Sequence, residues 1–173
     1  MRALFLDRDG IINQDFGYVY KIEDFKFCDG IFELLRVFRD RGYTIFIVTN
    51  QSGIGRGYYT LEDFNKLTEF MLKEFKKEGI EIASVEFCPH APEANCSCRK
   101  PKTGMIDNIL SKYKINLDKS WLIGDKQSDI DLAINAKIAN SVAIGSKDIK
   151  NSCYNFDTIS KCRDFFALNS ELL

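Results

Sequence analysis

Short apolar segments alternate with amphipathic segments along most of the 173-residue chain. The apolar segments are rich in β-branched and aromatic residues and predict buried strands at 1–6, 43–48, 83–87, 121–123 and 141–144. The segments between them predict helices at 31–39, 61–77, 105–113 and 130–137, followed by one more short strand and a helix around 163–168. Strands separated by helices pair in parallel, and fully apolar strands are covered on both faces. The sequence therefore predicts an α/β fold with one Rossmann-like, doubly wound parallel sheet.

The length of the chain and its charge narrow the possibilities further. We expect a single domain spanning residues 1–173 without a separate cap domain, because only 13–27 is long enough to form a flap. The net charge of −1 gives no general attraction to nucleic acid or to an anionic membrane. No apolar run approaches the ~18 residues that span a bilayer, and the first ten residues do not resemble a secretion signal. We therefore expect a cytoplasmic monomer.

Acidic and hydroxyl side chains follow several of the predicted strands, where a parallel sheet binds its ligands. Asp7 and Asp9 follow the first strand, Thr49 ends the second and Asp125 follows the fourth. Polar turns explain each one alone but not their convergence. Close carboxylates repel each other unless a cation lies between them, and hard oxygen ligands favour Mg²⁺. Asp7 can then act as a nucleophile and Asp9 as an acid and base, while Thr49 and Lys100 stabilise a phosphoryl group.

A second cluster combines three cysteines with the single histidine of the chain. Cys88, His90, Cys96 and Cys98 lie within eleven residues and supply the complete tetrahedral set of a structural Zn²⁺ site. The alternative is a group of buried cysteines beside an unrelated histidine. The basic stretch 99–102 follows directly, so a bound zinc ion would fix a basic loop and lower the cost of ordering it around a phosphate.

The segments DRDG, TNQSG and GDKQSD, with the lysine region between them, resemble the motifs of the haloacid dehalogenase superfamily of phosphatases. The resemblance implies that Asp7 is the nucleophile and Asp9 the general acid and base. It also implies that Asp7, the carbonyl of Asp9 and Asp125 hold magnesium. Asp129 either supports this site or complements the dipole of a helix, and the sequence leaves both roles open.

The segments CPH…CSCRKPKTGM, DRDGIINQDFGYV and TNQSGIGRGYYT resemble a branch that contains heptose bisphosphate phosphatases and histidinol-phosphate phosphatases. The resemblance implies a substrate site made of Asp15, Phe16, Gly17, Tyr18, Asn50, Gln51, Ser52, Arg99 and Lys126.

The expected reaction is hydrolysis of the 7-phosphate of D-glycero-D-manno-heptose 1,7-bisphosphate through an aspartyl-phosphate, which would serve lipopolysaccharide or capsule precursors. The short spacing between His90 and Cys96 instead resembles that of the histidinol-phosphate phosphatases, which implies histidinol phosphate as the alternative substrate. Hydrolysis at polynucleotide ends is disfavoured because the sequence lacks a basic surface interleaved with aromatic residues. A non-catalytic, zinc-stabilised binding module is the remaining alternative.

Overall fold

The computed structural model describes residues 1–145 and 148–173. Its strands are β1 (Arg2–Leu6), β2 (Tyr43–Asn50), β3 (Ile82–Cys88), β4 (Trp121–Gly124), β5 (Asn140–Ile144) and β6 (Tyr154–Phe156). Its α-helices are α1 (Ile31–Asp40), α2 (Ser52–Gly55), α3 (Leu61–Lys77), α4 (Gly104–Lys112), α5 (Gln127–Asn135) and α6 (Ile159–Leu168). In this part of the chain the strands form one sheet in the order β3-β2-β1-β4-β5-β6, and every pairing is parallel. The predicted α/β fold with a parallel sheet is confirmed.

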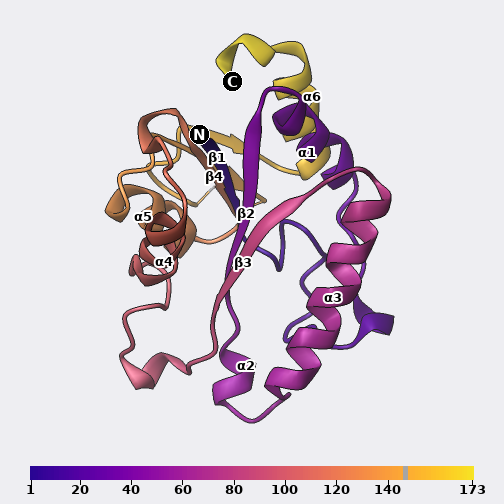
Figure 1. The fold of residues 1–173 in the computed structure, drawn as a ribbon, viewed down its shortest axis with the longest axis vertical. Coiled ribbons are helices and arrows are strands. Elements are labelled where there is room, and N and C mark those ends of the chain that lie inside the picture. The colour runs from indigo at the N-terminus through magenta and orange to yellow at the C-terminus, as the bar shows by residue number, and fades with distance from the viewer. Residues whose placement is uncertain (146–147) are drawn as a thin grey trace.

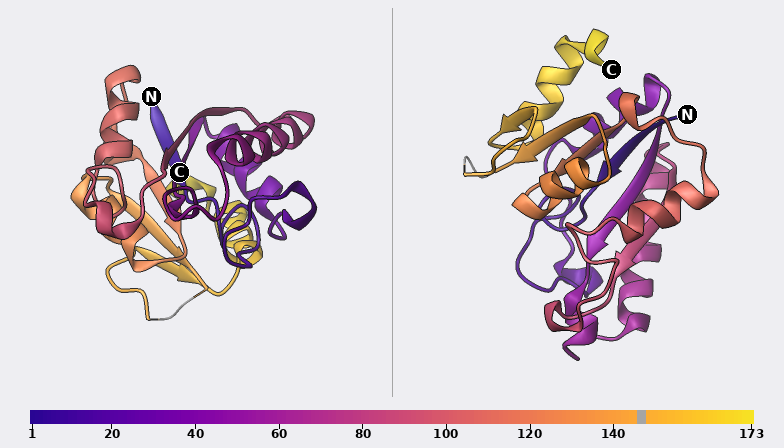
Figure 2. Two further views of the ribbon diagram at one scale, coloured as in Figure 1. Left: turned by 90° about the horizontal axis from the view of Figure 1, so that it is seen from below. Right: turned by 90° about the vertical axis from the view of Figure 1, so that its left-hand side faces the viewer.

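The alternation of side chains along each central strand divides the apolar interior into two cores. In β1, Leu4 and Leu6 pack in a first core beneath α1, α3 and α6. Ala3 and Phe5 point to the other face and join a second core beneath α4 and α5. Helices therefore cover both faces of the sheet (Figures 1 and 2), as the continuous apolar strands predict.

Two of the predicted helices begin earlier than their apolar patterns indicated. Helix α5 begins at Gln127, where Asp129 accepts a hydrogen bond from the backbone N–H of Lys126 and so satisfies one of the free donors at the start of the helix. Helix α6 begins at Ile159, where the side chain of Thr158 caps it. In α5 a polar first turn hides the start of the helix from a search for apolar periodicity, whereas in α6 the buried pair Ile159 and Cys162 was a signal that the prediction missed. The four-residue helix α2 was not predicted, since it is short and contains two glycines.

The order of the strands places the end of β1 at the topological switch point of the sheet. From β1 the chain crosses to β2 on one side, and β4 pairs on the other side. Ligands in sheets of this kind bind outside the carboxyl ends of the strands at this point. Helix α2 follows β2 at the same edge, and both chain termini lie at the opposite end of the molecule (Figures 1 and 2). None of the helices in the described ranges is long and apolar enough to cross a membrane.

Candidate active site

Asp7 follows β1 directly and lies buried beside the ammonium group of Lys100. Lys100 Nζ is 2.8 Å from Asp7 Oδ1, 2.6 Å from Asp129 Oδ1 and 3.0 Å from the carbonyl oxygen of Val48. Burial raises the pKa of Asp7 to about 6, with Lys100 opposing this effect and Asp129 adding to it. The two neighbouring carboxylates hold the pKa of Lys100 above its usual range although burial works in the other direction. The lysine therefore remains charged and fixes the two acids.

Asp125 completes a group of three carboxylates with Asp7 and Asp129, whose ligand atoms all lie within 4.8 Å of one another. Burial, followed by the charge of Asp7, raises the pKa of Asp125 to about 7. Asp125 Oδ1 is buried and has no hydrogen-bond partner among the described residues. A Cβ at Gly10 would lie 2.2 Å from Asp125 Oδ2, so only glycine leaves room for this carboxylate. An orphaned oxygen within a group of mutually repelling acids fits a divalent, oxygen-seeking cation such as Mg²⁺.

Asp129 makes two contacts, which correspond to the two roles that the sequence left open. Its Oδ2 accepts a hydrogen bond from the N–H of Lys126 at 3.0 Å and so caps α5. Its Oδ1 pairs with Lys100 across the site. The same carboxylate thus begins the helix and orients the buried lysine.

The side chain of Asp9 lies outside the group of three carboxylates and is held by three donors. Arg8 Nη2 and Asn13 Nδ2 donate to Oδ1 at 2.9 and 3.0 Å, and Gln51 Nε2 donates to Oδ2 at 2.9 Å. Burial raises the pKa of Asp9, but the charge of Arg8 and these hydrogen bonds outweigh it, so the net pKa is below its usual range. Asp9 is therefore ionised at neutral pH before a phosphate arrives.

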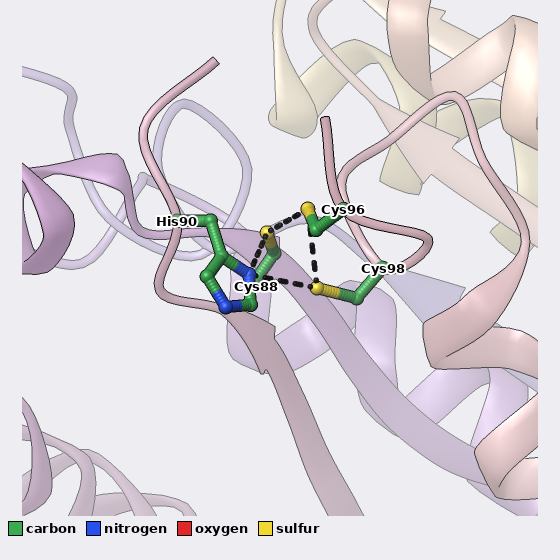
Figure 3. Close-up of side chains that lie close together, drawn as sticks. All are labelled: Cys88, His90, Cys96 and Cys98. Carbon is green, nitrogen blue, oxygen red and sulfur yellow. Dashed lines mark hydrogen bonds between the residues drawn. The ribbon is translucent and has the colours of Figure 1, made fainter. Parts of the chain in front are cut away.

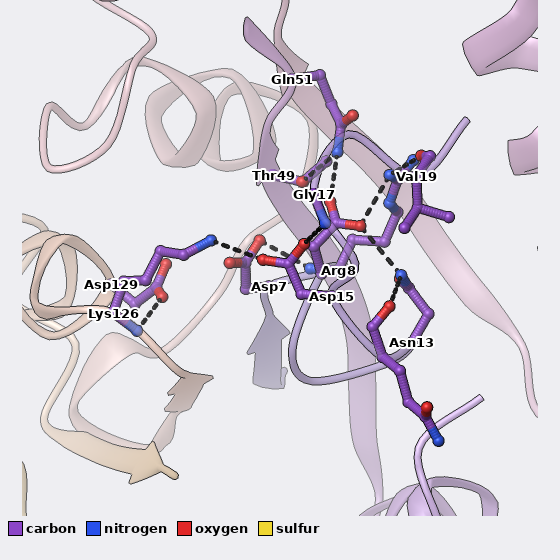
Figure 4. Close-up of polar contacts among 12 residues, drawn as sticks. Asp7, Arg8, Asn13, Asp15, Gly17, Val19, Thr49, Gln51, Lys126 and Asp129 are labelled. Carbon is purple, nitrogen blue, oxygen red and sulfur yellow. Dashed lines mark hydrogen bonds and ion pairs between the residues drawn. The ribbon is translucent and has the colours of Figure 1, made fainter. Parts of the chain in front are cut away.

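Thr49, at the end of β2, is fully buried, and its hydroxyl accepts a hydrogen bond from Gln51 Nε2 at 2.8 Å (Figure 4). The other end of the Gln51 amide accepts a hydrogen bond from the hydroxyl of Tyr59. Burial raises the pKa of Tyr59 to about 12, so this hydroxyl keeps its proton at neutral pH. The Gln51 amide thus connects Thr49, Asp9 and Tyr59.

A cavity of about 310 Å³ opens beside Asp9 and contains most of the predicted substrate residues. Its lining includes Asp15, Gly17, Tyr18, Asn50, Gln51, Ser52, Arg99 and Lys126. Phe16 is not part of this lining, and 60% of its surface is exposed. The side chain of Lys126 reaches Asp15 Oδ2 at 3.5 Å (Figure 4) and connects the loop after β1 to the start of α5. Arg99 Nη1 is buried with no partner among the described residues, which leaves a donor available to an anion.

Two residues that line this cavity, Tyr59 and Ser128, were not predicted from the sequence. Ser128 lies in the first turn of α5, inside the motif that supplies Asp125, so its position within GDKQSD was an available signal. Tyr59 lies beyond α2, and no spacing rule connects it to the acids. The fold alone brings it to the site.

The predicted zinc ligands converge at the end of β3 (Figure 3). Cys88 Sγ and Cys98 Sγ each lie 3.5 Å from Cys96 Sγ, and His90 Nδ1 lies 3.2 Å from Cys98 Sγ. A tetrahedron with Zn–S bonds of 2.3 Å has edges of ~3.8 Å, so the four atoms already have nearly the spacing that zinc requires. Desolvation raises the pKa of Cys96, but the N–H of Arg99 and the two other thiols outweigh it and bring the pKa to about 6. A thiolate is therefore available as a ligand.

Hydrogen bonds connect the cysteine loop to the loop after β2. The N–H of Gln51 donates to the carbonyl of Cys88 and the N–H of Gly55 to that of Pro89, both at 2.8 Å. The side chain of Asn50 accepts from the N–H of Lys100 at 3.0 Å and donates to its carbonyl at 3.4 Å. The position of Lys100 therefore depends on both loops.

The parallel sheet with a buried aspartate at its switch point, a bridging lysine and an acidic cation site defines a phosphatase of the haloacid dehalogenase type. A sequence model of the polynucleotide kinase 3 phosphatase family matches residues 5–171. The chain is 47% identical over 165 residues to D-glycero-beta-D-manno-heptose-1,7-bisphosphate 7-phosphatase of Helicobacter pylori, covering 95% of this chain and 93% of that protein. It is also 47% identical to D-glycero-alpha-D-manno-heptose-1,7-bisphosphate 7-phosphatase of Campylobacter jejuni, covering 95% of each.

Among solved structures, D,D-heptose 1,7-bisphosphate phosphatase from B. bronchiseptica, complexed with magnesium and phosphate, has the same fold. The TM-score is 0.87 at 23% identity, with 98% of this chain and 99% of that chain covered. The chain therefore belongs to the polynucleotide kinase 3 phosphatase family and, within it, to the heptose 1,7-bisphosphate 7-phosphatases. The family resemblance seen in the sequence is confirmed.

Proposed function

We propose that this enzyme removes the 7-phosphate from D-glycero-D-manno-heptose 1,7-bisphosphate and releases heptose 1-phosphate for nucleotide-activated heptose synthesis. The observation that carries the proposal is a buried Asp7–Lys100 pair whose near neighbours in the chain, Asp9 and Arg99, line a cavity together with Lys126. Relatives that act on this sugar match 95% of the chain at 47% identity.

In the proposed mechanism Asp7 attacks the phosphorus atom and forms an aspartyl-phosphate. The leaving sugar oxygen takes a proton from Asp9, whose pKa rises when a phosphate dianion approaches it. Water then attacks the phosphorus, Asp9 accepts a proton from it, and the bond to Asp7 breaks. Lys100 and the hydroxyl of Thr49 stabilise the charge on the phosphoryl oxygens in both steps.

We assign the magnesium site to the side chains of Asp7 and Asp125 and to the carbonyl of Asp9. Magnesium bound there would offset the repulsion between the acids and the incoming phosphate. The orphaned Oδ1 of Asp125 supports this assignment. The bridging Lys100 separates Asp129 from the nucleophile, so Asp129 supports the site from outside the ligand set.

We assign structural zinc to Cys88, His90, Cys96 and Cys98. Four ligands leave no open coordination position, so zinc would stabilise the loop and not take part in hydrolysis. The loop that it would hold carries Arg99, which we propose recognises the substrate, and Lys100. Asp15, Gly17, Tyr18, Asn50, Ser52 and Lys126 would complete the sugar site, with Phe16 at its rim.

Phosphate release from a panel of substrates tests the proposal. The panel consists of the α and β anomers of heptose 1,7-bisphosphate, fructose 1,6-bisphosphate, histidinol phosphate and a 3′-phosphorylated oligonucleotide. We expect the highest kcat/KM with one of the heptose anomers and none of this activity in Asp7→Asn. A higher kcat/KM with histidinol phosphate or with the oligonucleotide would overturn the substrate assignment, and turnover by Asp7→Asn would overturn the mechanism.

We further propose that the enzyme acts as a cytoplasmic monomer without nucleic-acid or membrane partners. The net charge of −1 supports the absence of a general attraction to polyanions. Light scattering on the eluting peak of a size-exclusion column should give the mass of one chain, 19.9 kDa. A mass of twice this value would refute the monomer.

A further inference from the structure

The hydrogen bonds around Asp9 determine which of its oxygens can carry a proton. Oδ1 accepts from both Arg8 and Asn13, and these two donors occupy its two lone pairs. Among the described residues, only Gln51 Nε2 donates to Oδ2. One lone pair of Oδ2 therefore remains free, and the proton exchanged with substrate or water must be carried there.

The Gln51 side chain can approach Oδ2 in one orientation only. Its Nε2 faces two acceptors, Asp9 Oδ2 and Thr49 Oγ1, at 2.9 and 2.8 Å. If the amide were turned over, its oxygen would face the carboxylate, the hydrogen bond to Asp9 would be lost, and the Thr49 hydroxyl would have to donate to Gln51 instead of accepting from it. The Tyr59 hydroxyl donates to Gln51 Oε1 and stabilises the observed orientation. Because Thr49 accepts from Gln51, its own hydrogen stays available to a phosphoryl oxygen.

Tyr59 is itself held firmly. Its side chain is 5% exposed, and its ring stacks on that of Tyr20 with centroids 5.2 Å apart and an interplanar angle of 8°. The ring also lies against Gly53 in α2, where a Cβ would come within 2.1 Å of Tyr59 Cε1. Contacts with a glycine and a second tyrosine thus hold the ring that carries the hydroxyl.

We propose that Gln51 and Tyr59 are positioning residues for the acid and base: Tyr59 fixes the amide of Gln51, and Gln51 directs the free lone pair of Asp9 Oδ2 toward the leaving oxygen. This inference rests on the proposed role of Asp9, and it assigns to Gln51 a role other than direct contact with the sugar. Gln51 is only 2% exposed, and its amide already makes three hydrogen bonds within the site.

Oδ2 gives up its proton in the first step of the reaction and regains one in the second. When the bond between phosphorus and the sugar oxygen breaks, the proton on Oδ2 passes to that oxygen and neutralises it. When water attacks the aspartyl-phosphate, its proton passes to Oδ2, the bond to Asp7 breaks, and inorganic phosphate leaves. A misdirected Oδ2 would slow the first step most when the leaving group is a basic alkoxide.

The test compares substrates whose leaving groups need a proton to different degrees. p-Nitrophenolate leaves without protonation, whereas a sugar alkoxide requires it. For Tyr59→Phe we expect kcat/KM for heptose 1,7-bisphosphate to fall about fivefold, the usual effect of one neutral hydrogen bond. The value for p-nitrophenyl phosphate should change by less than about twofold, because no positioned acid is needed. Gln51→Leu should show a larger loss on the sugar phosphate, together with a smaller loss on p-nitrophenyl phosphate, because Thr49 also loses its donor.

Tyr113→Phe is the matched control. Its hydroxyl donates to the carbonyl of Ala83 at 3.1 Å, so the variant loses the same group outside the site. We expect its activity on both substrates to equal that of the wild type. Thermal unfolding of each variant shows whether the fold is intact.

Asp9→Asn separates this inference from the proposed function. If Asp9→Asn loses activity selectively on the sugar phosphate while Tyr59→Phe loses none or loses equally on both substrates, the positioning role is overturned. If Asp9→Asn itself shows no dependence on the leaving group, the acid and base role fails instead.

Discussion

Lys100 is the residue through which the buried charges of the site are balanced. Its ammonium group lies between Asp7 and Asp129, at 2.8 and 2.6 Å, in a position closed to solvent. A buried cation with two acidic partners is costly to disturb, because removing either partner leaves a poorly compensated charge. The site is therefore sensitive to residues that never touch the substrate.

Asp129→Asn tests this dependence. The new amide oxygen can still accept from the N–H of Lys126 and cap α5. The negative charge of Asp129 is lost, however, so it no longer draws Lys100 away from Asp7. We expect kcat to fall about 10–100-fold, the usual cost of losing a partner that orients a metal site. The magnesium concentration at half-maximal activity should change as well. Steady-state kinetics over a magnesium titration measure both quantities.

Asp131→Asn is the control on the same helix, where the carboxylate accepts from Gln127 Nε2 at 2.9 Å. Its kinetics should match those of the wild type. Equal losses in the two variants would mean that α5 responds to any lost charge and that the Lys100 contact has no special role.

At the scale of single residues, the sequence was enough to predict which side chains follow the strands and what reaction they suit. It did not predict the residues that hold those side chains in place, such as Tyr59. Asp7, Asp9, Thr49 and Asp125 follow strands, so parallel pairing was enough to predict that they meet at one edge of the sheet. Tyr59 reaches the same place only because Gly53 lets its ring pack against α2. That contact depends on the path of a loop, which local pattern does not encode.

At the scale of elements, the cysteine loop and the loop after β2 behave as one unit. Two backbone hydrogen bonds and the side chain of Asn50 join them. A Cβ at Gly55 would come within 2.8 Å of the carbonyl oxygen of Pro89, so the two segments are in close contact. Loss of order in either loop should therefore displace Arg99 and Lys100, which follow the cysteine loop directly.

Cys98→Ser should remove zinc and loosen this unit. We expect about one zinc per chain in the wild type and much less in the variant. The variant's Tm should be lower by at least about 5 °C, since 1 kcal/mol corresponds to about 2–4 °C at this size. KM should rise more than kcat falls, because Arg99 lies on the loop. Metal analysis, thermal unfolding and kinetics check these results.

Cys153→Ser is the matched control, since Cys153 is exposed and lies outside the cluster. It should keep both its zinc and its Tm. Freshly reduced wild-type protein without zinc, or equal losses of Tm in the two variants, would contradict the zinc assignment.

Helix α3 shows how one local signal fixes an element boundary. Its predicted and observed limits agree, because an amphipathic pattern begins directly after a capping box. Thr60 accepts from the N–H of Asp63 at 3.1 Å, and Asp63 accepts from the N–H of Thr60 at 2.8 Å. Helix α5 has only the carboxylate half of such a box, from Asp129 to the N–H of Lys126, and its first three residues are polar, so the sequence placed its start too late.

The capping box of α3 predicts a pH-dependent contribution to stability. Hydrogen bonds from the backbone N–H and the hydroxyl of Thr60 hold the pKa of Asp63 below its usual range. A carboxyl whose pKa is lowered by folding stabilises the protein above its unfolded pKa, and this stabilisation is lost as the pH falls through the folded pKa. Asp63→Asn should therefore lower Tm at pH 7, and the difference from the wild type should shrink in acid. Thermal unfolding from pH 7 to pH 3 measures it.

Glu69→Gln removes a carboxylate from an exposed position farther along α3 and serves as the control. Its Tm difference from the wild type should stay small at every pH. A Tm difference between Asp63→Asn and the wild type that remained constant down to pH 3 would rule out the charged cap as its cause.

At the scale of the whole molecule, the sheet is shared by two cores that do not touch except through it. Trp121, the single tryptophan, lies in the first core, with its ring 5.0 Å from that of Phe166 and 6.2 Å from that of Phe38. Ile109, a residue of α4, lies fully buried in the second core. Because successive residues of β1, β2 and β4 supply the two cores in turn, neither core can lose its packing without disturbing strands of the other.

We therefore expect the two cores to unfold together. Ile109→Ala should lower the free energy of unfolding by about 2–5 kcal/mol, the usual cost of emptying a buried aliphatic site. In urea with zinc and magnesium present, Trp121 fluorescence and far-UV circular dichroism should give the same shifted midpoint with an unchanged m-value. If the fluorescence midpoint stayed at the wild-type value while the dichroism midpoint moved, the cores would unfold separately. The active-site edge would then join two units, and Asp7, which follows a strand shared by both, would lose its position before the first core unfolded.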